Sequence, residues 1–327
     1  MGFMELLDLT RMPIKADLYR QEVYYREARA DIIEHLGESA YALIRDGALL
    51  MMKPDGLVGG KLGSVCSFVR ERGFTVVAVE EVILDACKWR EIWRYQLNAA
   101  SIDRIVLKEA LYSARPCLIM LLRSEPGHDV PATVRLSSLK GAADPKNQVS
   151  GTLRSLLQQP NRLLSLVHFA DEPADLVREL AILFSREERL RLLSSLREQR
   201  LSATGEDRLR VALAEDCHPS SSLELAPSVS RAREALRLYA ESHPDSVTQF
   251  TEIGAALDRV VKGLKIDWRS WKQQIEALSV PVDPWDLIVI GSYSIIADEP
   301  GQSKMIGNPP PGAWARAIPQ SPSPAGR

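Results

Sequence analysis

The sequence lacks the features that mark several large classes of protein. Its four cysteines are far apart and form no CxxC pair, so we interpret them as reduced thiols rather than as a metal site or a disulfide framework. None of its five histidines has a metal-ligand spacing to another histidine or to a cysteine. No apolar run approaches the roughly 20 residues of a membrane helix. Acidic residues near the N-terminus do not fit a signal peptide. We therefore expect a cytoplasmic protein without a membrane partner.

An excess of charge of one sign is also absent. The chain carries 41 Lys and Arg residues and 43 Asp and Glu residues, which gives a formal net charge of −2. Such a balance produces no overall field that would attract nucleic acid or an anionic membrane. We therefore find no strong signal for nucleic-acid binding. The 327 residues are enough for two domains, or for one domain with large extensions.

Strand and helix patterns alternate through the first 187 residues. Helices are predicted over 15–38, 62–72, 87–114 (with two interruptions), 151–158 and from 171 onward. Strands are predicted over 47–52, 74–84, 116–122, 131–136 and 163–168. Split βαβ units of this kind build antiparallel sheets with helices on one face. We therefore predict an α+β, ferredoxin-like fold with an antiparallel sheet and helices on one of its faces, followed by a helical C-terminal region.

Beyond residue 185 the pattern becomes mainly helical. One late run, 286–293, is typical of a strand, and the sequence from residue 299 is rich in Pro, Gly and Ser, which is typical of a disordered segment. Further helices are predicted over 186–198, 229–241, 247–263 and 268–278. We divide the chain into an N-terminal helical extension (1–44), a central domain (45–187), a mainly helical region (188–292) and a flexible tail (293–327).

The stretch 165–185 carries the strongest chemical signal. His168 ends an apolar run typical of a buried strand, and Asp171 and Pro173 begin an amphipathic helix. Glu179 lies inside or beside the apolar stripe of that helix, where a buried carboxylate needs a partner. His168 is a candidate partner, because a carboxylate on one imidazole nitrogen decides which nitrogen is free to react. The alternative is a core histidine with a carboxylate at the edge of the stripe.

Three segments together resemble the nucleoside diphosphate kinase family. Residues 47–80 resemble its first strand, its KPDG turn and its first helix, and GTLRSLL from Gly151 resembles its GTIRG segment. The stretch from Val167 resembles its xxHGSD motif, with a glutamate eleven residues after the histidine. KPDG alone is a common string, but the three segments in this order and spacing are fairly specific. The resemblance covers roughly residues 45–187.

The resemblance implies phosphoryl transfer by a histidine. In that family a histidine takes the γ-phosphate of one nucleotide and passes it to a nucleoside diphosphate. His168 would be the nucleophile, and Glu179 would be the acid that orients it. The implied cofactor is Mg²⁺ carried by ATP or another nucleoside triphosphate, with no metal ligand from the protein itself. Four further positions match nucleotide- or phosphate-binding ones in the family: Lys53, Arg154, Asp171 and Trp93.

The sequence also departs from the family pattern. The motif's Gly and Ser are here Phe169 and Ala170, and the lid region is about three residues longer. Losing one charged contact typically costs ~1.5–3 kcal/mol, so several losses would cripple ordinary substrate use unless other groups replace them. The family's asparagine, second phosphate arginine and phosphate-binding threonine fall on Ser165, Ser137 and Ala143. Candidate replacements, each also interpretable as a solvated charge, are Arg115, Lys140, Lys146 and Arg162.

Two functional hypotheses follow. The preferred one is a phosphotransferase that moves the γ-phosphate of a nucleoside triphosphate, by way of a phosphohistidine, to a nucleoside diphosphate or a specialised acceptor. The alternative is a degenerate module that binds nucleotide or protein without catalysis, which the second helical region favours because a housekeeping kinase does not need it. Two further partner hypotheses are a homo-oligomer and a protein bound through the C-terminal helical region.

Overall fold

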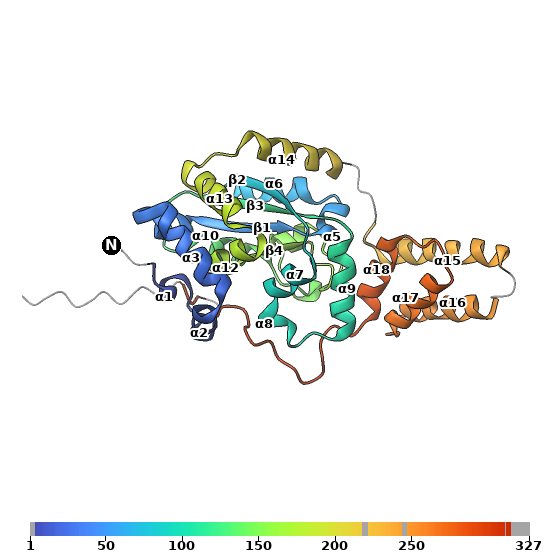
Figure 1. Cartoon of the computed structure of the whole chain (residues 1–327). Coiled ribbons are helices and arrows are strands. Elements are labelled where there is room, and N and C mark those ends of the chain that lie inside the picture. The colour runs from blue at the N-terminus through green and yellow to red at the C-terminus, as the bar shows by residue number, and fades with distance from the viewer. Residues whose placement is uncertain (1–3, 218–221, 244–246, 311, 315–327) are drawn as a thin grey trace, which may run out of the picture.

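A four-stranded antiparallel sheet forms the centre of the computed structural model (Figure 1). The structure describes residues 4–217, 222–243, 247–310 and 312–314. The strands are β1 (Gly47–Met52), β2 (Phe74–Val82), β3 (Cys117–Ser124) and β4 (Val167–Phe169). Their order is β2-β3-β1-β4, and each neighbouring pair is antiparallel. The predicted α+β class and its antiparallel sheet are confirmed.

Helices precede the sheet, connect its strands and follow it. The N-terminal part contains α1 (Leu6–Leu9), α2 (Pro13–Gln21), α3 (Val23–Leu36), the 3-10 helix η1 (Gly37–Ser39) and α4 (Ala40–Asp46). The connections contain α5 (Pro54–Val58), α6 (Leu62–Glu71), α7 (Ala86–Ile92), α8 (Arg94–Leu97), α9 (Ile102–Ser113), α10 (Ala132–Lys140), η2 (Pro145–Asn147) and α11 (Leu153–Leu156). After β4 come α12 (Pro173–Leu183), α13 (Arg186–Glu198), α14 (Ala203–Asp216), α15 (Leu225–Ser242), α16 (Val247–Val261), α17 (Trp268–Ala277) and α18 (Pro284–Ser294).

Helices cover both faces of the sheet, whereas the sequence analysis placed them on one face. Successive side chains of a strand point to opposite faces. In β1, Leu50 and Met52 pack into one apolar cluster with α6 and α9, while Leu49 and Met51 pack into a second cluster with α3 and α12. Every residue of β1 is buried. A strand that is apolar at every position is typical of burial on both faces, and this is the physical reason for the correction.

Two predicted strands are helices in the structure. Residues 131–136 open α10, which begins after Pro131, and residues 286–293 lie in α18. In α18, Pro284 occupies the first turn and the Asp283 side chain accepts a hydrogen bond from the backbone N–H of Trp285. A short apolar run cannot be assigned to strand or helix from periodicity when it is buried on all sides, as the middle of α18 is. Helix α14 was not predicted.

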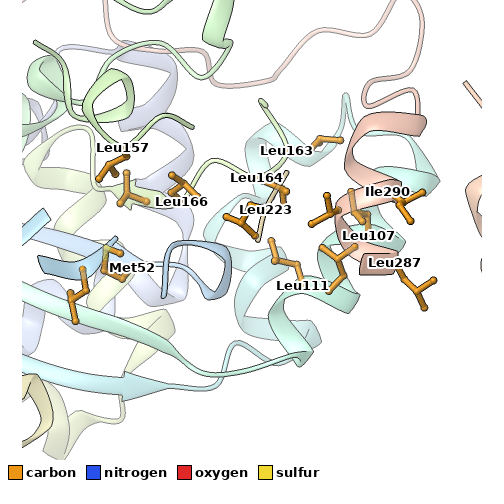
Figure 2. Close-up of a cluster of buried hydrophobic side chains, with 14 of the residues drawn as sticks. Met52, Leu107, Leu111, Leu157, Leu163, Leu164, Leu166, Leu223, Leu287 and Ile290 are labelled. Atoms are coloured by element: carbon orange, nitrogen blue, oxygen red, sulfur yellow. The ribbon is translucent and has the colours of Figure 1, made fainter. Parts of the chain in front are cut away.

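The C-terminal helices project from the side of the domain that carries α9 (Figure 1). Figure 2 shows one apolar cluster that joins Met52 of β1 to α18, by way of Leu107 and Leu111 of α9 and Leu287 of α18. A Cβ on Gly291 would lie 2.5 Å from the indole of Trp268, so only glycine permits this approach of α17 to α18. The helical region is therefore continuous with the core of the domain.

The chain after α18 returns across the domain, past α8, toward α1 and α2 (Figure 1). Ile306 is buried, and its backbone N–H donates to the carbonyl oxygen of Tyr95 over 3.1 Å. The Trp314 indole N–H donates to Glu172 over 2.9 Å. Ile306 and Trp314, in the segment predicted to be a flexible tail, thus contact the rest of the protein, because these apolar side chains find partners that composition does not reveal. Residues 315–327 lie outside the described residues.

A buried ionic network joins the N-terminal extension to the domain. The Lys15 ammonium lies 2.8 Å from Glu172 and 2.7 Å from Asp175, and all three side chains are almost fully buried. Burial acts to lower the pKa of Lys15, but the two carboxylates raise it above its ordinary value. The network links α2 to the start of α12, directly after β4. Within the described part of the chain, no helix is both long enough and apolar enough to cross a membrane.

Candidate active site

The KPDG turn after β1 shapes the backbone that leads into β4. The Asp55 carboxylate accepts a hydrogen bond from the backbone N–H of Leu166 over 2.9 Å, and the Lys53 N–H donates to the Leu166 carbonyl over 3.0 Å. A Cβ on Gly56 would lie 2.5 Å from that carbonyl oxygen. Leu166 has a φ of 59°, a left-handed conformation that these contacts hold in place. The turn thus supports the segment immediately before His168.

His168 and Glu179 are in contact, as the spacing predicted. The imidazole Nε2 lies 2.9 Å from Glu179 Oε1, across the connection from β4 to α12. The His168 side chain is 16% exposed and that of Glu179 is 5% exposed. Because a carboxylate oxygen can only accept, Nε2 carries the hydrogen and Nδ1 keeps its lone pair. The pair therefore has the geometry of an oriented nucleophile.

Two buried cations face the same region. The Lys53 ammonium donates to Ser165 Oγ over 2.6 Å and lies 3.4 Å from Asp55. Burial lowers the pKa of Lys53, an effect that the Asp55 carboxylate opposes and the nearby Arg154 strengthens. Arg154 donates from Nη1 to the Gly141 carbonyl over 3.0 Å, and burial lowers its pKa too. Its buried Nε has no hydrogen-bond partner among the described residues, so the guanidinium can donate to a further ligand.

A cavity of about 100 Å³ brings these groups together. An aromatic wall bounds it, in which Trp93 stacks on Tyr112 with 5.4 Å between ring centroids and meets His168 edge-on at 5.1 Å. The lining residues include five cations and no carboxylate. The cavity is lined by Lys53, Trp89, Trp93, Leu97, Arg104, Lys108, Tyr112, Arg154, Arg162, Ser165, Val167 and His168. Such a lining suits an anionic ligand.

Asp171 was predicted to contact nucleotide, but it does not line this cavity. Its carboxylate accepts from Ser137 Oγ over 2.7 Å and from Lys140 Nζ over 2.8 Å, both on α10. Burial alone would raise the pKa of Asp171, but the Lys140 charge and the two hydrogen bonds hold it well below its ordinary value. Asp171 therefore ties α10 to the loop after β4.

The altered positions do not all reach the cavity. Ser165 lines it, whereas Ser137 and Ala143 do not. Phe169 and Ala170 are buried and also stay outside its lining, because Phe169 points into the apolar cluster on the opposite side of β4. Ser165 is therefore the altered position that shares the cavity with His168, whereas Ser137, Ala143, Phe169 and Ala170 lie outside its lining.

The replacement cations predicted from the sequence are only partly found at the site. Arg162 lines the cavity, Arg115 pairs with Glu215, and Lys146 is exposed. Two further cations, Arg104 and Lys108 of α9, were missed. Their spacing of four residues can be read from the sequence, and it places them on one face of a helix. Which face of α9 meets the cavity is not a local property, so no sequence signal could identify it.

The central part of the chain is similar in sequence to known proteins. The family model described as nucleoside diphosphate kinase matches residues 46–189. A nucleoside diphosphate kinase of Nocardioides sp. is 31% identical over 136 residues, which are 42% of this chain and 94% of that protein. One of Sorangium cellulosum is 28% identical over 137 residues, which are 42% of this chain and 89% of that protein.

Solved structures give a weaker likeness. A transition-state mimic of the Borrelia burgdorferi nucleoside diphosphate kinase, with vanadate and ADP, is 23% identical, with a TM-score of 0.37, and covers 43% of this chain and 88% of that one. The Halobacterium salinarum enzyme in complex with CDP is 22% identical, with a TM-score of 0.35, and covers 42% and 87%. The sequence matches across nearly the whole length of the relatives, and the chain therefore belongs to the nucleoside diphosphate kinase family, with additional N- and C-terminal sequence.

Proposed function

We propose that the protein moves the γ-phosphate of a nucleoside triphosphate, by way of a phosphohistidine at His168, to a nucleoside diphosphate or a specialised acceptor. The observation that carries this proposal is the His168–Glu179 pair on the wall of a cavity lined by five cations. A neutral imidazole is nucleophilic near neutral pH, and fixed cations stabilise the charge of a phosphoryl group in transfer. A role in binding the transferred phosphoryl group also accounts for the burial of the charged side chains of Lys53 and Arg154.

The proposed reaction has two displacement steps. In the first, the Nδ1 lone pair of His168 attacks the γ-phosphorus, the nitrogen–phosphorus bond forms, and the bond to the bridging oxygen breaks to release a nucleoside diphosphate. In the second, a terminal phosphate oxygen of the acceptor attacks the same phosphorus and the nitrogen–phosphorus bond breaks. Glu179 holds the imidazole through Nε2 in both steps, and Lys53 and Arg154 hold the transferred group.

The proposed cofactor is Mg²⁺ carried by ATP or another nucleoside triphosphate. Mg²⁺ prefers oxygen ligands and commonly binds through substrate phosphates, where it neutralises their charge. The described residues contain no group of three or more His, Cys, Asp or Glu side chains that could hold a metal ion. The Nε atoms of Arg104 and Arg154, which have no hydrogen-bond partner within the described part of the chain, fit a phosphate ligand at this cavity.

A second candidate function is nucleotide or protein binding without catalysis. It is favoured by Ser137 and Ala143, which replace phosphate-binding side chains of the family, and by the added helices α15 to α18. The homo-oligomer, the protein partner at the C-terminal helices and the cytoplasmic location stay predictions. Formation of an acid-labile phosphoprotein from γ-labelled ATP separates the two candidates, because binding alone leaves no covalent label.

Replacing Glu179 with glutamine should slow phosphorylation of His168 by ~10–100-fold, the scale at which groups that orient a reactive side chain act. The amide can accept from Nε2, but it does not carry the charge that stabilises the imidazole N–H. Single-turnover labelling with γ-labelled ATP measures the rate, and calorimetry should show ADP affinity little changed.

Glu206→Gln is the matched control, because Glu206 is exposed on α14. The control should label at the wild-type rate. A wild-type rate in Glu179→Gln as well would contradict the orienting role and leave Glu179 as a structural partner of His168.

Turnover with standard nucleoside diphosphates should be weak, well below the ~10 per second of a typical enzyme. Ser137, Ala143 and Ser165 stand where the family has an arginine, a threonine and an asparagine, so the acceptor loses contacts that would stabilise the transition state. Steady-state assays with ADP, GDP, CDP and UDP measure this. Fast turnover on all four would show that Arg104, Lys108 or Arg162 compensates fully for the lost contacts.

A further inference from the structure

A carboxylate from the C-terminal segment lies at the rim of the cavity. Asp298 Oδ1 accepts from Arg104 Nη1 over 2.5 Å, and its other oxygen, Oδ2, accepts from Arg162 Nη2. Arg104 belongs to α9, and Arg162 belongs to the loop between α11 and β4. Both arginines line the cavity that contains His168. One anionic group therefore bridges two cations that come from different elements of the domain.

Backbone contacts fix the position of that carboxylate. Residues Ala100 and Asp298 form an isolated antiparallel bridge. The Ser101 N–H donates to the Ala297 carbonyl over 3.1 Å, and the Glu299 N–H donates to the Ala99 carbonyl over 2.9 Å. The segment after α18 is thus held against the chain between α8 and α9. The pairing of Ala100 with Asp298 places the Asp298 side chain beside Arg104 and Arg162.

The arginines have donor capacity that Asp298 does not use. Arg104 Nε is buried and has no hydrogen-bond partner among the described residues. The two oxygens of a carboxylate cannot meet all the donors of two guanidinium groups, each of which has five N–H bonds. A phosphate group offers more acceptor oxygens and more charge, and arginine is well suited to bind it in a bidentate manner.

The cavity is also too small for a whole nucleotide in this arrangement. Its volume is about 100 Å³, whereas pockets for small-molecule ligands typically hold ~300–1,000 Å³. Asp298 is 31% exposed and Arg162 is 50% exposed, so their contact is open to solvent and can be exchanged. A ligand with several phosphates would therefore gain both space and partners if the segment moved.

We propose that Arg104 and Arg162 form a subsite for a phosphate group of the nucleotide, and that Asp298 occupies this subsite in the free protein. This inference rests on the nucleotide site of the proposed function and adds two residues and a competitor to it. The nucleotide and the C-terminal segment then compete for the same two arginines. The apparent affinity is the intrinsic affinity multiplied by the fraction of molecules in which the subsite is free.

The test measures the affinity for ADP of a variant in which the competing side chain, that of residue 298, has lost its negative charge. In Asp298→Asn the side chain keeps its size but pairs weakly with Arg104 and Arg162. Calorimetry should show ADP binding tightened about fivefold, the factor that matches a partly exposed ion pair. Glu299→Gln removes the same charge one residue further on, where the side chain is exposed, and should leave ADP affinity unchanged. Adenosine, which has no phosphate, should bind equally to all variants.

A second variant tests the subsite directly. Arg162→Met, introduced into the Asp298→Asn protein, should reverse the gain in ADP affinity. Arg162 is half-exposed, so this variant should keep the fold, which circular dichroism can verify. Unchanged ADP affinity in Asp298→Asn, an equal gain for adenosine, or no ADP binding in any variant would each overturn the subsite.

The test of the subsite can fail or succeed independently of the test of the proposed function. Tighter ADP binding in Asp298→Asn without any phosphohistidine would support the subsite and refute the catalytic proposal. Phosphohistidine formation with the same ADP affinity in wild type and Asp298→Asn would refute the subsite and leave catalysis intact.

Discussion

His168→Ala should abolish acid-labile phosphate on the protein, the largest loss of activity that we expect from any single change. The imidazole is the only side chain in the cavity lining that combines a free lone pair with a carboxylate partner, among the residues that the structure describes. Alanine removes the atom to which phosphorus would bond, so no compensating contact can restore the intermediate. Labelling with γ-labelled ATP, followed by acid treatment, measures the effect.

A matched control uses another histidine. His128 lies in the loop after β3. Its backbone carbonyl accepts from Arg45, and its side chain has no hydrogen-bond partner among the residues that the structure describes. His128→Ala should therefore label like wild type. Because His168 is part of a short strand, circular dichroism should confirm that His168→Ala retains its secondary structure. Equal labelling of His168→Ala and wild type would mean that His168 is a core histidine, the alternative raised by the sequence.

Lys15→Met should lower the free energy of unfolding by about 3–5 kcal/mol, the typical effect of removing one partner of a buried ion pair. Methionine fills a similar volume, but Glu172 and Asp175 then stay buried without their counter-charge. Glu172 keeps its contacts with Thr10 and the Arg11 N–H, and Asp175 keeps Tyr19. These neutral donors cannot replace the ammonium charge. Urea denaturation followed by circular dichroism measures the difference.

Lys272→Met tests whether the effect belongs to the buried network. Lys272 pairs with Glu276 on the surface of α17, and a pair of this kind contributes little, about 0.3–0.5 kcal/mol. The control should stay close to wild-type stability. A loss in Lys15→Met no greater than that in Lys272→Met would show that the N-terminal extension is not anchored through Lys15.

Local patterns were sufficient to pair His168 with Glu179, the residues to which we assign the proposed chemistry. His168 and Glu179 are eleven residues apart, across one strand-to-helix connection, so an apolar stripe and a helix start were enough to pair them. The KPDG turn was equally informative, because its Pro, Asp and Gly each have a local backbone role. The two strands predicted wrongly, residues 131–136 and 286–293, are short apolar runs whose secondary structure depends on what buries them.

Local periods in the sequence were therefore enough to identify the strands β1 to β3, the KPDG turn and the histidine with its carboxylate. Which of the other groups meet at the candidate site was decided by tertiary packing. Arg104 and Arg162 meet Asp298 across separations of 194 and 136 residues, and no helical or strand period extends over such distances. Contacts of this kind arise when α9 and α18 pack through Leu107 and Leu287, because that packing places the following segment beside the cavity.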